Sequence, residues 1–328
     1  MPIILVTGGA GYIGSHTAQL LLDEGHEVVV LDNLSNGDRA IVPGGADFQK
    51  GDVSDRPMLD DLLAGRGIEA VLHFAGSIIV PESVENPLLY YRNNTVNSHG
   101  LIEACISAGV DKFIFSSTAA VYGEPAVVPV TEDSAKVPIS PYGTSKLMTE
   151  FMLRDTAAAH DFRYVALRYF NVAGADPEGR RGQSMANATH LIKLAVQTAL
   201  GLRDHLTIFG DDYDTPDGTG VRDYIHVTDL ADAHVKALNY LLGGGEAQVM
   251  NCGYGRGASV REVIAALEAV TGRPLPVEIG PRRAGDPPSL ISKADRVRDV
   301  LGWTPQLDDL ETIVEHALNW ERQLNQRR

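Results

Sequence analysis

The chain has 328 residues, of which 44% are hydrophobic, and a formal net charge of -15 at pH 7. A nucleic-acid backbone requires clustered Lys and Arg, so this acidic balance argues against nonspecific binding of nucleic acid. The length allows one large core or two unequal ones. We expect two lobes, residues 1–172 and 173–328, with segments of the second crossing back to the first.

Cysteine usage and hydropathy bear on the compartment. Cys105 and Cys252 lie in apolar stretches without metal-ligand spacing, as expected for reduced core thiols and no metal site. The chain enters a strand directly after Met1, which leaves no room for a cleavable leader. No run approaches roughly 18 consecutive apolar residues. We therefore expect a cytoplasmic protein that does not associate with a membrane.

Short apolar strands alternate with longer helical patterns in the first half of the chain. The clearest strands are expected at residues 3–7, 27–32, 70–74, 112–117 and 164–169. Helical patterns cover residues 12–22 and 85–108, the latter with Pro87 in its first turn and Asn86 as its cap. This alternation predicts a doubly wound parallel sheet with helices on both faces, a Rossmann-type α/β fold.

Beyond about residue 171 the texture changes. Residues 174–182 and 211–218 are rich in Gly and Asp and are expected to form loops over a cleft. Ser259-Val-Arg-Glu262 has the pattern of a capping box, and Gly272 can end the helix that follows. The second lobe is therefore expected to be smaller and mixed α/β.

Three glycines indicate a dinucleotide site. Gly8, Gly11 and Gly14 follow the first strand and open the first helix, the context in which a helix N-terminus binds a pyrophosphate. Asp32 ends the next strand, where a carboxylate accepts from an adenosine ribose 2′-hydroxyl and repels a 2′-phosphate. NAD is therefore expected rather than NADP; the competing role for Asp32 is a turn residue before Asn33.

Other strand ends suggest further cofactor contacts. Asp52 could bind an adenine amino group or stand in a solvated turn. The small residues after His73 would let the backbone approach the diphosphate, whereas His73 itself is expected to be packed. Asn93 and Asn94 on the long helix could reach the cofactor, although an isolated helical asparagine is usually solvated.

Tyr142 and Lys146 stand four residues apart after Pro141, so a helix places the phenol and the ammonium on one face. A positive charge within a few Å can lower a tyrosine pKa by ~1 to 3 units, which would make Tyr142 a base near neutrality. Thr118 ends a predicted buried strand at the sheet edge where reacting groups gather. Taken alone, these residues would be two solvated side chains and a capping hydroxyl.

Six motifs together resemble the UDP-glucose 4-epimerases of the extended short-chain dehydrogenase/reductase superfamily, over nearly the whole chain. They are Val6-Thr-Gly-Gly-Ala-Gly-Tyr-Ile-Gly-Ser-His16, Phe115-Ser-Ser-Thr118, Ser140-Pro-Tyr-Gly-Thr-Ser-Lys146, Arg168-Tyr-Phe-Asn171, Asp217-Gly-Thr-Gly-Val-Arg-Asp-Tyr-Ile-His226 and Arg282-Arg-Ala-Gly-Asp286. The last three narrow the resemblance from the superfamily to the epimerases.

The resemblance implies a chemistry. Tightly held NAD accepts a hydride from C4 of a UDP-hexose while Tyr142 removes the O4 proton. The 4-keto sugar then turns over with its uridine diphosphate anchored and regains the hydride on the other face, so UDP-galactose and UDP-glucose interconvert without net oxidation. Thr118 relays or orients the proton, and Lys146 also contacts the nicotinamide ribose.

The resemblance also implies the ligand contacts. Those to NAD are Gly8, Gly11, Tyr12, Ile13, Gly14, Asp32, Asn33, Asn36, Asp52, Val53, Phe74, Ala75, Asn93, Ser116, Tyr142, Lys146 and Tyr169. Those to the UDP-hexose are Thr118, Tyr142, Asn171, His190, Leu191, Thr207, Phe209, Arg222, Tyr224, Arg283, Asp286 and Leu290. Arg222, Arg283 and Asn171 would hold the uridine diphosphate, Asp286 would lie near the uridine ribose, and Phe209 would pack on the base. Either arginine alone would suggest a surface salt bridge.

Three positions depart from the family pattern. Ile78 stands where many relatives carry a lysine near the cofactor, so weaker retention of NAD is expected. Residues 180–189 also differ, which places His190 where an asparagine often contacts the ligand. Leu290 resembles the gate of the sugar pocket, where tyrosine restricts the site and Cys or Ser admits N-acetylated sugars. Leucine is intermediate, and we expect efficient turnover of UDP-galactose and UDP-glucose and poor turnover of N-acetyl sugars; otherwise Leu290 merely packs the lobe.

Other functions stay open at this stage. A nucleotide-sugar 4,6-dehydratase needs an acid and a base beside the tyrosine, but Ala119 and Ala120 follow Thr118. A silent nucleotide sensor on this fold disagrees with the intact Thr118, Tyr142 and Lys146. UDP-N-acetylhexosamines and UDP-pentoses are alternative substrates. The helix after Asn86 and the helix with Tyr142 resemble the pair that forms a four-helix dimer interface, so a homodimer is expected, although their apolar residues could equally be monomer core.

Overall fold

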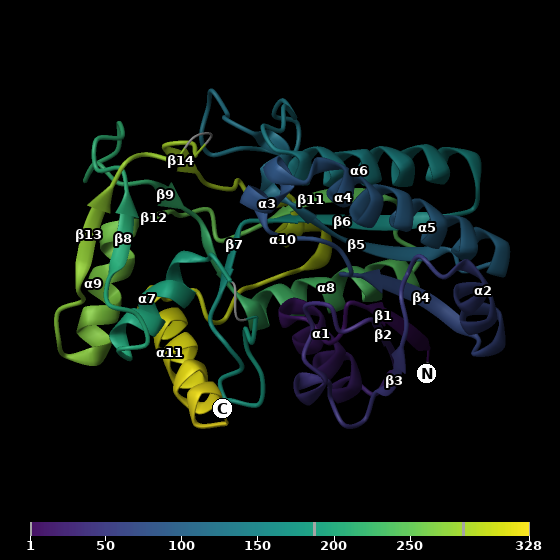
Figure 1. Cartoon of the computed structure of the whole chain (residues 1–328). Helices are drawn as coiled ribbons and strands as arrows, with labels where there is room; N and C mark the ends of the chain where they lie inside the picture. Colours follow the sequence, from purple (N-terminus) through teal and green to yellow (C-terminus); the bar gives the residue numbers. More distant parts are fainter. Residues whose placement is uncertain (1, 186–187, 284–285, 328) are drawn as a thin grey trace.

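A seven-stranded parallel sheet forms the centre of the computed structural model, which describes residues 2–185, 188–283 and 286–327 (Figure 1). Its strands, in order across the sheet, are β3 (Asp47–Lys50), β2 (Glu27–Asp32), β1 (Ile3–Thr7), β4 (Ile68–His73), β5 (Lys112–Thr118), β6 (Arg163–Tyr169) and β11 (Gln248–Cys252). Every pairing in the sheet is parallel. The order from β3 to β6 is that of a Rossmann fold. The predicted fold class is confirmed.

Helices cover both faces of the sheet, as Figure 1 shows. One face carries α1 (Tyr12–Asp23) and α8 (Val227–Leu242), and the other carries α2 (Arg56–Gly65), α5 (Asn97–Ala108) and α6 (Pro141–Ala159). Alternate side chains of a strand point to opposite faces. Thus Ile4 and Val6 of β1 pack in the core with α1 and α8, while Leu5 packs in the core with α2 and α5. The central strands β1, β2 and β4 are mostly apolar because both of their faces are buried.

The helical pattern predicted over residues 85–108 is divided in the structure. It comprises α3 (Val80–Glu85), α4 (Pro87–Tyr90), the π-helix η2 (Tyr91–Val96) and α5. Pro87 begins α4 as expected, because a proline cannot continue the preceding helix. Asn86 precedes α4, but its side chain makes no capping hydrogen bond. The π-helix was not predicted; such turns often mark functional sites.

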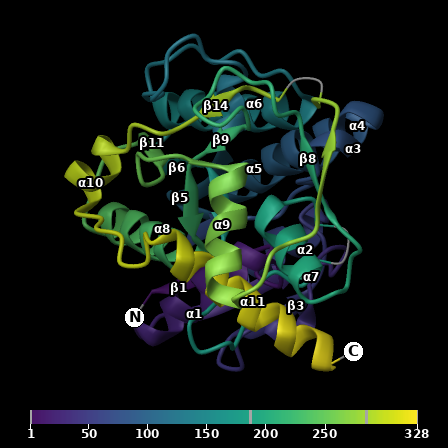
Figure 2. The same cartoon turned by 90° about the vertical axis from the view of Figure 1, so that its left-hand side faces the viewer.

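The second lobe combines short sheets and helices, seen end-on in Figure 2. Its strands are β7 (Asn171–Ala173), β8 (Leu206–Phe209), β9 (Val221–Arg222), β10 (Tyr224–His226), β12 (Ala258–Ser259), β13 (Val277–Gly280) and β14 (Ser289–Leu290). Its helices are α7 (Leu191–Ala199), α9 (Val260–Thr271), α10 (Asp295–Leu301) and α11 (Leu310–Arg327). In the first lobe, the 3₁₀ turns η1 (Arg39–Ile41) and η3 (Ala119–Tyr122) follow β2 and β5.

The capping box and the helix end that the sequence predicts in this lobe are confirmed. Ser259 Oγ accepts from the Glu262 N–H at 3.0 Å, and the Glu262 carboxylate accepts from the Ser259 N–H at 2.6 Å. Gly272 follows α9 with a φ of 69°, a left-handed conformation that glycine adopts without strain.

The chain returns to the first sheet through α8 and β11. We propose the division expected from the sequence, 1–172 and 173–328, with α8 and β11 as the segments that cross back.

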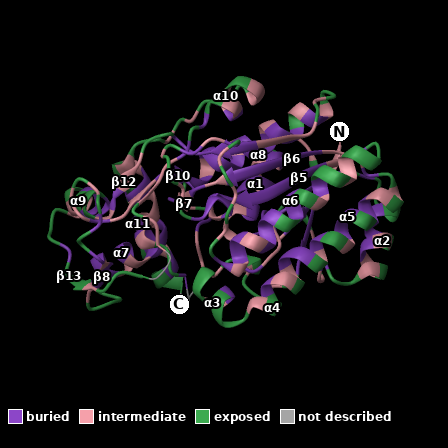
Figure 3. Ribbon diagram, turned by 90° about the horizontal axis from the view of Figure 1, so that it is seen from above, coloured by how far each residue is buried: buried purple, intermediate pink, exposed green. Residues whose placement is uncertain are grey.

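The distribution of burial distinguishes the two sides of the helical layer. Figure 3 shows buried strands beneath α6 and exposed turns on the outer sides of α3 and α4. Within the described ranges, no helix is both long enough and apolar enough to cross a bilayer.

A buried ion pair fixes α6 to the sheet. Glu150 of α6 and Arg168 of β6 are each 4% exposed in their side chains, and Arg168 Nε donates to Glu150 Oε1 at 2.9 Å. The Ser117 hydroxyl donates to the same carboxylate oxygen at 2.5 Å, and Arg168 Nη1 donates to the Tyr122 hydroxyl at 2.9 Å. This network joins the end of β5, β6 and the middle of α6.

Replacing Arg168 by Met leaves the Glu150 carboxylate buried without its partner. We expect the free energy of unfolding to fall by ~3–5 kcal/mol, because an uncompensated buried charge is costly. The double variant Glu150→Leu/Arg168→Met removes both charges and should recover most of that loss. Arg154→Met on the exposed side of α6 should cost less than ~1 kcal/mol, since Arg154 is 62% exposed. Urea unfolding measures all three, and a double variant as unstable as the single one would contradict the prediction.

Candidate active site

A cleft of about 1530 Å³ lies between the carboxyl ends of the central strands and the loops of the second lobe. Most of the residues predicted to contact ligands line it. From the first lobe they are Gly8, Gly11, Tyr12, Ile13, Gly14, Asp32, Asn33, Asn36, Asp52, Val53, Phe74, Ala75, Asn93, Ser116, Thr118, Tyr142 and Tyr169. At the lobe boundary it is Asn171, and from the second lobe they are His190, Arg222, Arg283, Asp286 and Leu290. Parallel strands end at one edge, which is why segments distant in sequence meet there.

The glycine-rich turn between β1 and α1 leaves no room for side chains. Gly8 has a φ of +72°, and a Cβ there would lie 2.6 Å from the Ala75 nitrogen. A Cβ on Gly14 would lie 2.4 Å from the Gly8 carbonyl oxygen. Gly11 precedes α1 without a side-chain cap. The turn therefore presents a helix N-terminus to the cleft, an arrangement that fits the pyrophosphate of a dinucleotide.

Two carboxylates lie at the adenosine end of this predicted site. Asp32 is 8% exposed, and its oxygens accept from the Ala10 N–H at 3.0 Å and the Leu34 N–H at 2.8 Å. Asn33 Nδ2 donates to Asp52 Oδ2 at 2.6 Å. Burial acts to raise the pKa of Asp52, but hydrogen bonds from Ser54 and Asn33 outweigh it and lower that pKa. Both carboxylates keep a lone pair for a ribose or adenine donor.

Tyr142, Thr118 and Lys146 come together at the junction of β5 and α6. Tyr142 is 7% exposed, Thr118 is 8% and Lys146 is 3%. Lys146 Nζ donates to the Ser116 carbonyl oxygen at 3.0 Å and lies 4.9 Å from the Phe115 ring centroid. Lys146 therefore stands behind the cleft surface, whereas Tyr142 and Thr118 line it.

The pKa of Tyr142 shifts opposite to the direction expected from the Tyr142–Lys146 spacing. Burial raises the pKa of Tyr142, and its hydrogen bond with Thr118 offsets only part of that effect. Burial also lowers the pKa of Lys146 to about 8. The spacing alone could not show this, because the Lys146 ammonium is bonded to the Ser116 carbonyl and both groups are removed from water.

The π-helix brings two asparagines to this junction. Asn93, which lines the cleft, donates to the Ser77 hydroxyl at 3.0 Å. Asn94 is 2% exposed; its Oδ1 accepts from the Ser77 N–H at 2.7 Å and its Nδ2 donates to the Ser145 hydroxyl at 3.0 Å. Asn94 thus links the β4 loop to the helix of Tyr142, a role that sequence position alone did not indicate.

The two arginines of the second lobe have different partners. Arg222 forms an ion pair with Asp286, and the Arg283 guanidinium lies 3.8 Å from the Phe209 ring centroid. Each holds its cationic group at the cleft. Of the motif at 282–286, residues 284 and 285 lie outside the described ranges.

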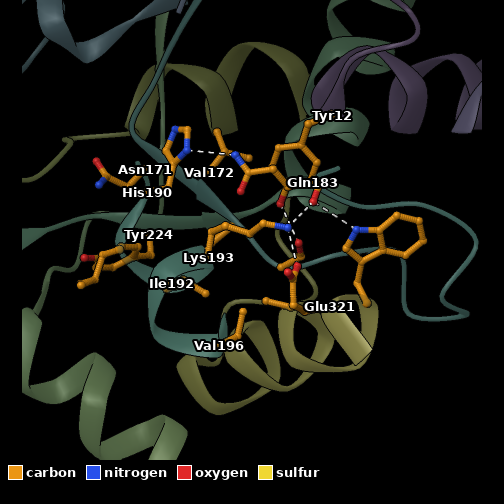
Figure 4. Close-up of a pocket in the computed structure, with 15 residues that line it drawn as sticks. Tyr12, Asn171, Val172, Gln183, His190, Ile192, Lys193, Val196, Tyr224 and Glu321 are labelled. Carbon is orange, nitrogen blue, oxygen red and sulfur yellow. Dashed lines mark hydrogen bonds and ion pairs between the residues drawn. The ribbon is translucent and has the colours of Figure 1, made fainter. Parts of the chain in front are cut away.

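Four predicted substrate residues do not line this cleft. Leu191 and Tyr224 border a small cavity behind its wall, together with Asn171 and His190 (Figure 4). Thr207 and Phe209 lie on β8, and neither lines the cleft. Phe209 instead lies under Arg283.

Some cleft residues were not singled out from the sequence. Gln183, Ser184 and Met185 line it, in a loop whose only signal was its departure from the family pattern. Gln183 Nε2 and His190 Nδ1 are 2.9 Å apart. Ile78, which the sequence did place near the cofactor, is 39% exposed and lines the cleft as well. Among the described residues, no three His, Cys, Asp or Glu side chains gather as metal ligands.

Lys146→Met tests the cost of burying the ammonium. Below about pH 8 the Lys146 side chain is charged in both the folded and the unfolded chain, so folding must bury a charge and the folded state bears the full cost of desolvating it. Between about pH 8 and 10.5 only the unfolded chain keeps the proton, and this cost declines as the pH rises. At about pH 7 the variant should therefore be more stable than the wild type, by on the order of 2 kcal/mol.

This difference in stability should shrink as the pH approaches 10.5, the pKa of a lysine side chain in water. Urea unfolding of ligand-free protein across this pH range measures it. Lys236→Met, at a partly exposed position on α8, is the control. A stability difference for Lys146→Met that does not change with pH would contradict the prediction.

Comparison with known proteins places this geometry in a family. Residues 4–253 match the NAD dependent epimerase/dehydratase family. The UDP-glucose 4-epimerase of Azospirillum brasilense is 59% identical over 325 residues, covering 99% of this chain and 93% of that protein.

Two solved structures are similar over nearly their whole length. One is the UDP-glucose-4-epimerase of Stenotrophomonas maltophila with bound NAD and formylated UDP-arabinopyranose, with a TM-score of 0.97, 39% identity and 100% coverage of both chains. The other is the UDP-Glc/GlcNAc 4-epimerase of Campylobacter jejuni, with a TM-score of 0.87, 51% identity and coverage of 98% of this chain and 100% of that one. The chain belongs to the NAD-dependent epimerase/dehydratase family and, within it, to the UDP-glucose 4-epimerases.

Proposed function

We propose that this protein is an NAD-dependent UDP-glucose 4-epimerase, which interconverts UDP-galactose and UDP-glucose through a transient 4-keto sugar. The observation that carries this proposal is the convergence, in one cleft, of the glycine turn, the Thr118–Tyr142 pair and the two arginines. When bound, NAD supplies a hydride acceptor for C4 of the sugar and a positive charge that favours the phenolate of Tyr142.

The residues of the chain perform the proton transfer and the positioning. Tyr142 takes the proton from the sugar O4 and returns it, with Thr118 orienting the hydroxyl that reacts. Lys146, held by the Ser116 carbonyl, places a cation beside this junction. All three side chains are themselves largely removed from bulk water.

Anchoring the uridine diphosphate requires local positive charge in an acidic chain. Arg222 and Arg283 supply it, with Asn171 as a hydrogen-bonding neighbour on the same wall of the cleft. The Asp286 carboxylate pairs with Arg222 and is also available to a ribose hydroxyl. With the diphosphate held at this end, the sugar is free to turn over and present its other face.

The proposal is tested by incubating purified protein with UDP-galactose, without added cofactor, and assaying UDP-glucose. Turnover together with NAD released from the denatured protein is the expected result. Turnover only after NAD is added would keep the chemistry but show weak retention, which the apolar Ile78 at the cleft favours. Release of a 4-keto-6-deoxy sugar would instead indicate a dehydratase.

Tyr142→Phe separates an enzyme from a silent sensor. Loss of the proton acceptor should reduce kcat by at least ~100-fold, the usual contribution of a general base, while bound NAD is retained. Tyr240→Phe, outside the cleft, should keep full turnover. A Tyr142→Phe variant with wild-type turnover would exclude the assigned role.

Leu290 sets the expected specificity. It lies on β14, lines the cleft and packs against the cluster of Phe170 and Leu147. We expect turnover of UDP-galactose and UDP-glucose to exceed that of the N-acetyl sugars by at least about tenfold, because a larger group must displace this side chain. The Campylobacter jejuni relative is described as acting on both kinds of sugar. Comparable rates for both pairs here would refute the size argument, and a UDP-pentose such as UDP-xylose is the next substrate to assay.

The assembly and compartment are also proposals. Exposed apolar side chains outside the cleft lie on α4, η2 and α6: Leu88, Val96, Met148 and Phe151. We propose that a second copy covers them, forming a homodimer in the cytoplasm. A monomer mass that is independent of concentration in sedimentation would exclude the dimer.

A further inference from the structure

Gln183 in the cleft wall is held from behind by two helices. Its backbone carbonyl accepts from Lys193 Nζ at 2.7 Å and from the Trp320 indole N–H at 3.2 Å (Figure 4). Its side-chain amide lies 2.9 Å from His190 Nδ1. A single residue thus connects α7, α11 and the cleft.

The lysine on this carbonyl belongs to a buried ion pair. Lys193 of α7 pairs with Glu321 of α11, and their side chains are 5% and 2% exposed. Gln197 Nε2 donates to the other oxygen of Glu321 at 3.1 Å. None of the residues of α11 lines the cleft. Glu321 therefore has no place in the cleft surface itself, and Lys193 links it to the Gln183 carbonyl.

The chain before Gln183 is in close contact with α11 as well. A Cβ on Gly182 would lie 2.5 Å from the Trp320 ring, so the backbone lies flat against the indole. The contact with Trp320 fixes the distance of Gly182 from α11. The two hydrogen bonds fix the direction in which the Gln183 carbonyl points. An unpaired buried carbonyl would be costly.

Stability alone gives little reason for a buried pair at this place. Desolvating two charges costs several kcal/mol per ion, and apolar side chains of similar volume are often as stable or more stable. What apolar side chains cannot supply is the Lys193 hydrogen bond, the shorter of the two that the Gln183 carbonyl accepts. The pair is therefore better explained by the position it gives to the loop.

The consequence reaches the imidazole of His190. A side-chain amide nitrogen only donates, so His190 Nδ1 accepts and the proton of the neutral ring is on Nε2. His190 then offers one N–H donor to the cleft that it lines.

We propose that Lys193 and Glu321 are positioning residues for the UDP-hexose: they hold Gln183, and Gln183 orients His190 as a hydrogen-bond donor to the ligand. The inference rests on the proposed function, since it takes the UDP-hexose as the ligand of this wall. It adds to the site two charged residues that touch neither substrate nor cofactor.

The double variant Lys193→Met/Glu321→Leu tests the inference without leaving a charge buried. We expect its Tm to stay within about 3 °C of the wild type or to rise. The KM for UDP-galactose and the Kd for UDP-glucose should both increase about tenfold, as when one hydrogen bond to a charged group is lost. The kcat should change less than about twofold, because Tyr142 and Thr118 are untouched.

Two further measurements distinguish positioning from a general structural role. The NAD content of the double variant should equal that of the wild type, and Glu315→Gln, at an exposed position on α11, should alter neither KM nor Kd. Unchanged KM and Kd in a folded double variant would overturn the inference. So would losses of Tm, NAD and kcat in parallel, which would indicate a structural role only.

The same experiment separates this inference from the proposed function. Wild-type protein that binds UDP-glucose without converting it would disprove the epimerase activity, while the Kd values would still decide the positioning role. Wild-type protein that binds no UDP-glucose would overturn both.

Discussion

The position of α6 on the sheet is the constraint on which the proposed chemistry depends. Tyr142 and Lys146 lie in the first turns of this helix, and their relation to Thr118 is set by where the helix contacts β5 and β6. The Glu150 carboxylate makes that contact specific, because it binds Arg168 of β6 and the Ser117 hydroxyl of β5 at once. A helix held only by apolar packing could rotate or slide by a fraction of a turn, whereas these hydrogen bonds have one geometry.

The two arginines of the cleft are opposite in sign to the net charge of the chain. The chain as a whole has a net charge of -15, but the cleft contains Arg222 and Arg283, each with a local partner. In the proposed function, an anionic ligand is therefore bound by fixed short-range contacts and not by the field of the whole molecule. The pairing of Arg222 with Asp286 also prepares the guanidinium, since its orientation is set before a ligand arrives.

Contacts within the second lobe fix the positions of the residues in one wall of the cleft. Its short strands β9 and β14 pair with each other and place Arg222 beside Leu290 in register. Behind the opposite part of the wall, Lys193 and Trp320 hold Gln183. The return of the chain through α8 and β11 joins this lobe to the main sheet, so its loops and the strand ends belong to one framework.

Local signals predicted much of the fold. The apolar strands were located to within a few residues, since each is buried on both faces, and the capping box at Ser259 and the helix end at Gly272 depend only on adjacent residues. The division of residues 85–108 was missed because the π-helix η2 is maintained by bonds from Asn94 to Ser77 and Ser145, which are distant in sequence. The dinucleotide turn was recognisable because only glycine fits at Gly8 and Gly14, where another backbone segment lies too close for a Cβ.

The sequence by itself determined which chemical groups are present and in which segments they lie: a glycine turn after a strand, a tyrosine and a lysine one helical turn apart, and two arginines in the second half of the chain. These follow from periods and spacings within one segment. Only the tertiary structure decided which groups line the cleft, that burial raises the pKa of Tyr142, and that α11 holds Gln183. Burial and long-range hydrogen bonds depend on what packs against a residue, and spacing along the chain does not contain that information.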